Sequence, residues 1–225
     1  MKILALLCVL ITGCPAKENL QGASFVFSKS SNSARVVLKP SEVTGLLSNI
    51  TVCLQSYTDY VARDSLFKLD DKYSIPRFHV FQIENVYYIR IDKDQVLYRT
   101  NKESMEWRLI CVSWESSTGL IHFVVNGKLF PRRVLKPGFI IGPQVTAVLG
   151  HKLASVTGLG SSVGGPSYIG EIGNVHMWDR ALHPTEMQSL YFTNCSQCNG
   201  TLISWTSVDY EIYGDIFLYR PSEKP

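Results

Sequence analysis

Apolar and polar residues alternate with a period of two along most of this chain. Successive side chains of a β-strand point to opposite faces, so this alternation is typical of strands that bury one face. The segments that carry it are 24–27, 51–54, 79–83, 86–91, 108–114, 121–125, 202–205 and 215–219. We therefore predict a chain built from many short strands.

Turn and helix signals complete the predicted architecture. Asn126-Gly127 lies between two alternating runs and predicts a type I′ hairpin, because both central positions of that turn need positive φ. In the only segment with a helical pattern, Pro184 is compatible with the first turn and Met187, Leu190 and Tyr191 fall on one side. Strands never alternate with helices, so we predict an all-β fold: an antiparallel, concanavalin-like β-sandwich of the jelly-roll kind with one short helix.

Composition and charge agree with a single globular domain over residues 17–225. Of the 225 residues, 45% are hydrophobic and 18% are charged, which excludes disorder, collagen and coiled coil. The formal net charge is +3, and no basic run is longer than Arg132-Arg133. Nucleic-acid binding is therefore not predicted.

The first sixteen residues have the pattern of a secretory signal peptide. Lys2 precedes an apolar run over 3–11, and Cys14 and Ala16 lie three residues and one residue before a cut ahead of Lys17. The run is too short to cross a bilayer and no later segment is longer, so we predict a secreted, extracellular protein without a membrane span. An alternative is a bacterial lipoprotein signal that makes Cys14 a lipid anchor.

The cysteines favour structural disulfides. Without the leader four remain, an even number that predicts two disulfides in an oxidising compartment: Cys53, Cys111, Cys195 and Cys198. The Cys195-x-x-Cys198 pair has other interpretations, as a redox pair or half of a zinc site. No second Cys-x-x-Cys exists and no histidine follows at zinc-finger spacing, so we favour a local bridge, with a link between chains as the alternative.

Several motifs resemble the short pentraxin family. The match covers residues 23 to about 219 and includes Cys111-Val112-Ser113-Trp114-Glu115-Ser116, Val125-Asn126-Gly127-Lys128 and Gly170-Glu171-Ile172-Gly173-Asn174-Val175-His176-Met177-Trp178-Asp179. The first position of the family signature, normally His, is Leu109 here. The resemblance implies a flattened jelly roll with its helix on one face, a Cys53–Cys111 disulfide, a homo-oligomeric ring usually of five protomers, and ligand recognition through calcium on the other face.

The calcium donors that the resemblance implies are missing at most matching positions. Calcium takes six to eight oxygen ligands, several of them carboxylate. The family's donor positions fall here on side chains without such oxygens: Ile75, Pro76, Lys152, Leu153 and Ala154. A different register places Asp70 and Asp71 near the first pair, and with Glu171 they are weak candidates for one ion. We therefore expect the family's double-calcium site to be lost or badly weakened.

The resemblance also locates a ligand pocket. Phe81 falls at or next to the aromatic that lines it, with a core-facing position as the alternative, and Gln95 falls near the acid that closes it around a choline-like cation. A neutral amide lacks that acid's charge, although Tyr87 and Tyr98 offer π faces. We therefore expect ligand preference to have moved away from phosphocholine.

An enzymatic function is not predicted. Gly160-Ser161-Ser162-Val163-Gly164 matches the Gly-x-Ser-x-Gly elbow, but no helix follows it and the segment 155–167 is simply rich in glycine and serine. Among three sequons we expect glycans at Asn49 and Asn199, whereas Asn194 precedes a cysteine whose disulfide hides it.

The leading hypothesis is a secreted pentraxin-like recognition protein. It binds carbohydrate or phosphorylated head groups in a lectin-like, multivalent manner, since a ring converts weak single-site binding into avidity. The alternative is a structural glycoprotein of an extracellular matrix or coat that has no ligand pocket.

Overall fold

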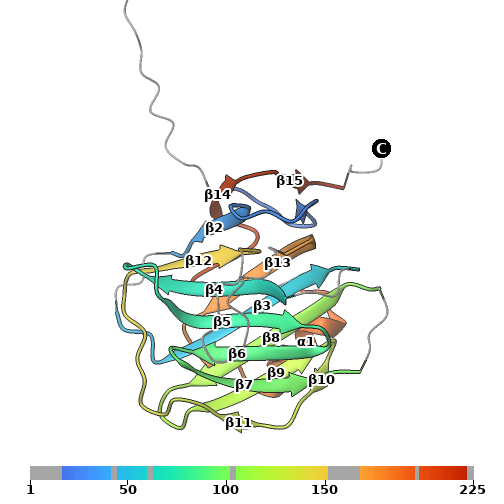
Figure 1. The fold of residues 1–225 in the computed structure, drawn as a ribbon. Coiled ribbons are helices and arrows are strands. Elements are labelled where there is room, and N and C mark those ends of the chain that lie inside the picture. Colours follow the sequence, from blue (N-terminus) through green and yellow to red (C-terminus); the bar gives the residue numbers. More distant parts are fainter. Residues whose placement is uncertain are drawn as a thin grey trace, which may run out of the picture.

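The computed structural model is a sandwich of two antiparallel sheets (Figure 1) and describes residues 17–41, 45–59, 63–101, 105–151, 168–195 and 198–221. The predicted signal peptide, 1–16, lies outside these residues. One sheet has eight strands, in the order β10-β9-β8-β3-β13-β1-β15 with β11 paired to β9. Its strands are β1 (Ser24–Phe27), β3 (Asn49–Tyr57), β8 (Arg108–Glu115), β9 (Leu120–Val125), β10 (Lys128–Leu129), β11 (Arg133–Val134), β13 (Gly170–Trp178) and β15 (Ile216–Tyr219).

The other sheet has seven strands, in the order β14-β2-β12-β4-β5-β6-β7. Its members are β2 (Arg35–Lys39), β4 (Arg63–Asp71), β5 (Pro76–Ile83), β6 (Val86–Ile91), β7 (Asp94–Arg99), β12 (Val145–Leu149) and β14 (Asp209–Tyr213). The predicted antiparallel β-sandwich with one short helix is confirmed.

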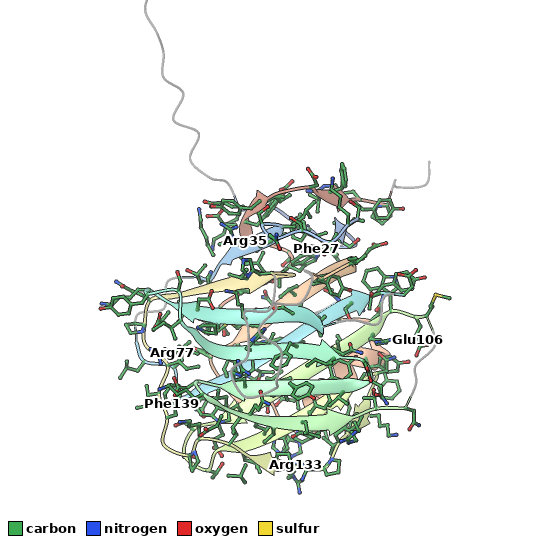
Figure 2. All side chains as sticks on the ribbon, in the orientation of Figure 1. Phe27, Arg35, Arg77, Glu106, Arg133 and Phe139 are labelled. Atoms are coloured by element: carbon green, nitrogen blue, oxygen red, sulfur yellow. A yellow bond between two sulfur atoms is a disulfide. The ribbon has the colours of Figure 1, made fainter. Side chains whose placement is uncertain are left out.

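The core lies between the two sheets and is dense in aromatic side chains (Figure 2). Fully buried members of this cluster include Phe25, Phe27, Phe67, Phe78, Tyr87, Trp114, Phe123, Tyr168 and Trp205. Two buried indoles keep a polar partner, since Trp114 Nε1 donates to Leu135 O at 2.9 Å and Trp205 Nε1 donates to Ala23 O at 3.1 Å. The core therefore gains large apolar area without leaving these donors unpaired.

Helix α1 (Pro184–Phe192) packs on the outer face of the eight-stranded sheet. His183 caps its N-terminus in a capping box with Glu186, and Met187 is buried against Cys53 and Cys111. Tyr191, which the helical pattern places on the same side as Met187, is 43% exposed. Its ring instead covers the hairpin turn, where a Cβ added to Gly127 would meet it at 2.9 Å.

The predicted hairpin is confirmed and one predicted strand is wrong. Asn126 and Gly127 have φ of 47° and 74°, and they join β9 to β10. Residues 202–205 form no strand but a single bridge, Met177↔Ile203. Met177 O accepts from the N–H groups of both Leu202 and Ile203, which ends the ladder after one residue.

A disulfide joins Cys53 and Cys111, which face each other directly in the pairing of β3 with β8. It closes a loop with a sequence separation of 58 residues, which corresponds to about 4 kcal/mol of stabilisation in the chain-entropy model. Because both cysteines point outward, this bridge lies beneath α1 and not in the main core.

The two ends of the described domain meet at one corner. β1 pairs with β15, and Glu18 forms a bridge with Val208. The carboxylate of Glu18 also forms an ion pair with Arg220 and accepts from the Tyr210 hydroxyl at 2.5 Å.

Candidate functional site

Two rows of side chains cross the outer face of the seven-stranded sheet. One row follows the pairing Lys68↔His79, His79↔Arg90 and Arg90↔Gln95 over β4, β5, β6 and β7. The second row contains Ser65↔Phe81 and Phe81↔Tyr88. Residues between these positions, such as Val80 and Ile89, belong to the core, so the two rows point away from it.

The structure brings the two predicted pocket residues, Phe81 and Gln95, together through a third residue, Arg90. Phe81 stacks on Tyr88 with ring centroids 4.9 Å apart, and the Arg90 guanidinium carbon lies 5.4 Å from the Phe81 centroid. Arg90 Nη2 also donates to Gln95 Oε1 at 2.9 Å. A cation of the chain itself therefore occupies the space between the aromatic ring and the amide. Tyr87 and Tyr98, whose π faces were considered for the same role, lie in the core.

Burial changes the protonation of this face. It lowers the pKa of His79 to about 3, and the nearby charges of Arg90 and Lys68 act in the same direction. His79 is therefore neutral at physiological pH, with its Nε2 2.9 Å from Ser65 Oγ. Burial also lowers the pKa of Arg90, although a guanidinium stays charged, and its buried Nε has no hydrogen-bond partner among the described residues.

Asp70 is paired with a lysine of the chain and is not left open for a metal ion. It lies at the end of β4 and forms an ion pair with Lys68. Burial raises the pKa of Asp70, while the hydrogen bond from Lys68 opposes that rise. Its Oδ1 is buried and has no hydrogen-bond partner in the described part of the chain, so one carboxylate oxygen remains.

Asp71 is fully engaged in the turn between β4 and β5. Its Oδ1 accepts from the N–H groups of Tyr73 and Ile75 at 2.9 and 3.0 Å, and its Oδ2 accepts from Arg77 Nε at 2.9 Å. Arg77 also pairs with Asp92 at 2.8 Å. Partial burial acts to raise the pKa of Asp71, but the hydrogen bonds from Ile75, Arg77 and Tyr73 hold it below its ordinary value.

The residues that the structure describes do not fit the calcium site implied by the resemblance. Glu171 lies in β13 of the other sheet, where Ser24 Oγ donates to its Oε2 at 2.7 Å, so it does not join Asp70 and Asp71. Ile75 contributes its N–H to Asp71, and Pro76 begins β5. Lys152, Leu153 and Ala154 lie outside the described residues. One free oxygen of Asp70 is far short of six to eight ligands.

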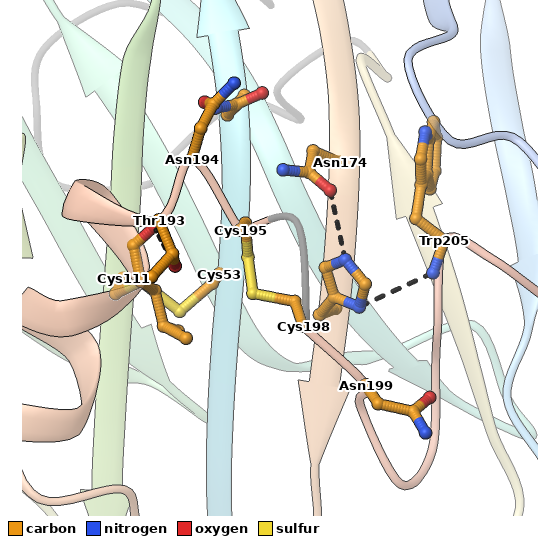
Figure 3. Close-up of a disulfide and its surroundings, with 12 residues drawn as sticks. Cys53, Cys111, Asn174, Thr193, Asn194, Cys195, Cys198, Asn199 and Trp205 are labelled. Atoms are coloured by element: carbon orange, nitrogen blue, oxygen red, sulfur yellow. Dashed lines mark hydrogen bonds between the residues drawn. A yellow bond between two sulfur atoms is a disulfide. The ribbon is translucent and has the colours of Figure 1, made fainter.

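The second cysteine pair lies beyond α1 on the helix-bearing face (Figure 3). Cys195 and Cys198 are joined in the structure, with their Cα atoms 4.9 Å apart. No histidine follows this pair at zinc-finger spacing, whereas His176 of β13 has its ligand atom within 4.8 Å of both sulfurs. Burial lowers the pKa of His176 to about 4. A contact between segments that are close in space but far apart in the sequence leaves no spacing signal.

The two expected glycosylation residues lie at the surface. Asn49 is half-buried as the first residue of β3, and Asn199 is exposed in the loop after Cys198 (Figure 3). Glycosylation of both remains a prediction.

The two antiparallel sheets and the helix on one outer face match the fold that the pentraxin resemblance implies. The Pentaxin family matches residues 23–221, and the chain belongs to this family. It is 36% identical over 217 residues to C-reactive protein of Xenopus laevis, covering 95% of this chain and 90% of that protein. It is 33% identical over 204 residues to serum amyloid P-component of Bos taurus, covering 90% and 89%.

A solved structure has the same fold. The native heptameric SAP-like pentraxin from Limulus polyphemus superimposes with a TM-score of 0.73 at 15% identity, covering 90% of this chain and 97% of that chain. Among the described residues no helix is long and apolar enough to cross a membrane.

Proposed function

We propose that this protein is a secreted, ring-forming recognition protein that binds phosphorylated head groups directly, without calcium as a bridge. The observation that carries the proposal is the position of Arg90, stacked over Phe81 and bonded to Gln95 on the outer face of the seven-stranded sheet. The described carboxylates that were candidates for calcium on this face, Asp70 and Asp71, are paired with Lys68 and Arg77.

Arg90 argues against a choline-like ligand. A quaternary ammonium binds where an aromatic face and a negative charge meet. Here Gln95 is neutral and the Arg90 guanidinium already lies over Phe81, so a second cation would meet like charge. Phosphocholine is therefore a poorer ligand than a phosphate ester without the ammonium.

The same charges favour a phosphate. Lys68 and Arg90 approach His79 from neighbouring strands, and Asp70 is the acid paired with Lys68. Arg90 is half-buried, and although its Nε is inaccessible, a guanidinium forms strong, directional bonds to phosphate oxygens through its terminal N–H groups. A neutral His79 adds no charge of its own but supplies polar ring nitrogen atoms.

Assembly would make such binding effective. A relative of the same fold is described as heptameric, and the family resemblance implies a ring. Several equivalent sites on one face can raise the apparent affinity by about two orders of magnitude without any new contact.

The alternative function, a structural coat glycoprotein, is favoured by one observation. Phe81, the aromatic expected to line the pocket, is 0% exposed. If the side chains that cover Phe81, such as Tyr88 and Arg90, do not move aside, this face has no pocket and the protein acts through its glycans and assembly.

Surface plasmon resonance tests the proposal on three surfaces: a hexose phosphate, the same hexose without phosphate, and phosphocholine. We expect the hexose phosphate to be bound best, equally in millimolar calcium and in chelator. R90Q should weaken that binding about tenfold, because a charged hydrogen bond is lost. The matched control R99Q removes the same charge from the exposed end of β7 and should leave binding unchanged.

Each other outcome contradicts the proposal. Binding of phosphocholine that needs calcium would mean that the family's calcium site is intact. Failure of all three surfaces, with an intact ring in light scattering, would support the structural glycoprotein.

A further inference from the structure

The outer face of the eight-stranded sheet contains a groove of about 650 Å³ that none of the roles above uses. It lies next to the end of α1, and its lining residues come from β1, β3, β13, β15 and the loops beside them. Its volume is in the range of small-molecule sites. It is on the opposite side of the sandwich from Phe81 and Arg90.

The local backbone explains why this surface is hollow. β13 changes register against β3 between Gly173 and His176, and Asn174 at this bulge has φ of 50°. Gly173 leaves the floor without a side chain, since a Cβ there would meet Ala23 O at 2.8 Å. The bulge directs Asn174 to the rim, while Cys195 and Asn194 approach from the segment after α1 (Figure 3).

One wall of the groove is aromatic. Tyr57 and Trp107 stack with ring centroids 5.6 Å apart and an angle of 29° between their planes. Trp107 is 43% exposed, whereas the remaining tryptophans, Trp114, Trp178 and Trp205, are at most 5% exposed. A half-exposed tryptophan in a groove wall offers a flat apolar face together with a polar N–H, which suits a binding surface.

The amides on the rim and floor have unused hydrogen-bonding capacity. Gln55 Nε2 donates to Asn194 Oδ1 at 2.8 Å, which leaves Gln55 Oε1 as an acceptor and Asn194 Nδ2 as a donor. Asn174 Oδ1 lies 3.1 Å from His176 Nε2, which leaves Asn174 Nδ2 as a second donor. These groups offer donors and acceptors side by side, the pattern that pairs with hydroxyl groups that both donate and accept.

The charge of the groove decides which hydroxylated ligand it accepts. Glu171 lines it, and Ser24 occupies one of the two carboxylate oxygens. Among the described residues, no lysine, arginine or histidine lines the groove. Phosphate, sulfate and carboxylate groups would therefore be repelled, and one carboxylate cannot supply a calcium shell.

We propose that this groove binds a neutral saccharide without calcium. The sugar ring stacks on Trp107, while its hydroxyl groups bond to the amides of Gln55, Asn174 and Asn194 and to the free oxygen of Glu171. The site goes beyond the phosphate-binding function proposed for the other face, and the two sites are independent.

A glycan array of neutral and acidic oligosaccharides, read in chelator, tests the proposal. All proteins carry S196A, which removes the sequon at Asn194 so that no attached glycan competes. We expect neutral saccharides to be retained and acidic ones not. W107A should lose binding by about tenfold or more, while W107F keeps an aromatic ring and should retain most of it.

Two further measurements separate the groove from the other face and from folding. R90Q should leave saccharide binding unchanged. Since Trp107 is the exposed tryptophan of the described chain, the bound saccharide should shift tryptophan emission in the parent protein and not in W107F, even if W107A folds poorly.

Three results would overturn the inference. The first is no retention of neutral saccharides in chelator, and the second is retention that W107A does not change. The third is a change of assembly mass in W107F by light scattering, which would make the groove a contact between subunits.

Discussion

The two outer faces of this sandwich differ in how their side chains interact. On the seven-stranded sheet, charged side chains bind one another within β4, as Lys68 does with Asp70, and between β4 and β5, as Asp71 does with Arg77. On the eight-stranded sheet, a helix and two disulfides cover the centre, and a bulge opens a groove whose amides bond only in part to their described neighbours. On the first sheet charged neighbours satisfy each other, whereas the interrupted pairing of β13 with β3 leaves groups for a ligand.

Removing each disulfide tests how much these two covalent links contribute to stability. Replacing Cys53 and Cys111 by serine should lower the free energy of unfolding by about 4 kcal/mol, because the loop that they close is long. The same change at Cys195 and Cys198, three residues apart, should cost about 2 kcal/mol. Urea unfolding without reductant measures both. Equal costs, or dimers on a non-reducing gel that disappear in C195S, would show that the second pair links chains.

Replacing Lys68 tests how much its ion pair on the seven-stranded sheet contributes to stability. K68M leaves Asp70 buried without its partner and should destabilise the protein by about 2 kcal/mol at neutral pH. The cost should shrink as pH falls, because protonation removes the stranded charge. The double variant K68M/D70N should recover most of the loss, and K72M, at an exposed neighbouring position, should change little. A full loss in the double variant would mean that Lys68 acts by packing alone.

The pH dependence of stability also compares the two faces, since each face has a buried histidine. The pKa is lowered to about 3 for His79 and about 4 for His176, against about 6.5 in an unfolded chain. Between these values the unfolded state binds more protons, so stability falls as pH drops below 6.5. Each histidine should contribute up to about 1.4 kcal/mol per pH unit. H79Q and H176Q should each flatten this decline in urea unfolding at pH 6.5 to 4, and an unchanged slope would contradict the burial of that ring.

Calcium should have the smallest effect of all. The nitrogen donors around Asp71 and the Lys68 partner of Asp70 leave too few oxygens for an ion, so millimolar calcium should raise the melting temperature by less than about 2 °C relative to chelator. R77Q, which frees Asp71 Oδ2, should increase that shift. A rise of several degrees in the parent protein would mean that donors beyond Asp70 and Asp71 complete a site.

Local sequence signals predicted what depends on local chemistry. Asn126-Gly127 specified its hairpin because positive φ is a property of those two residues. The alternation at 202–205 failed because the segment has no continuous partner, and only Ile203 meets Met177. Alternation states which way side chains point but not which strand lies beside them.

The candidate sites were harder to predict because they depend on register. Phe81 and Gln95 were found by resemblance, but Arg90 was missed because its place between them requires the pairing of β5, β6 and β7. His176 and the Cys195 pair meet across 19 residues of chain that include the whole helix. A single sequence contains no signal for such contacts.

The corner where Glu18 binds Arg220 and β1 pairs with β15 has a consequence for how the chain is connected. Residues 17 and 221 lie at the same edge, so the chain is suited to circular permutation: a short linker joins these two residues and the chain is cut at another turn. The turn at Asn126-Gly127 is held by Tyr191 and is a poor place for that cut. The order of strands in space, and not their order along the chain, is what this fold requires.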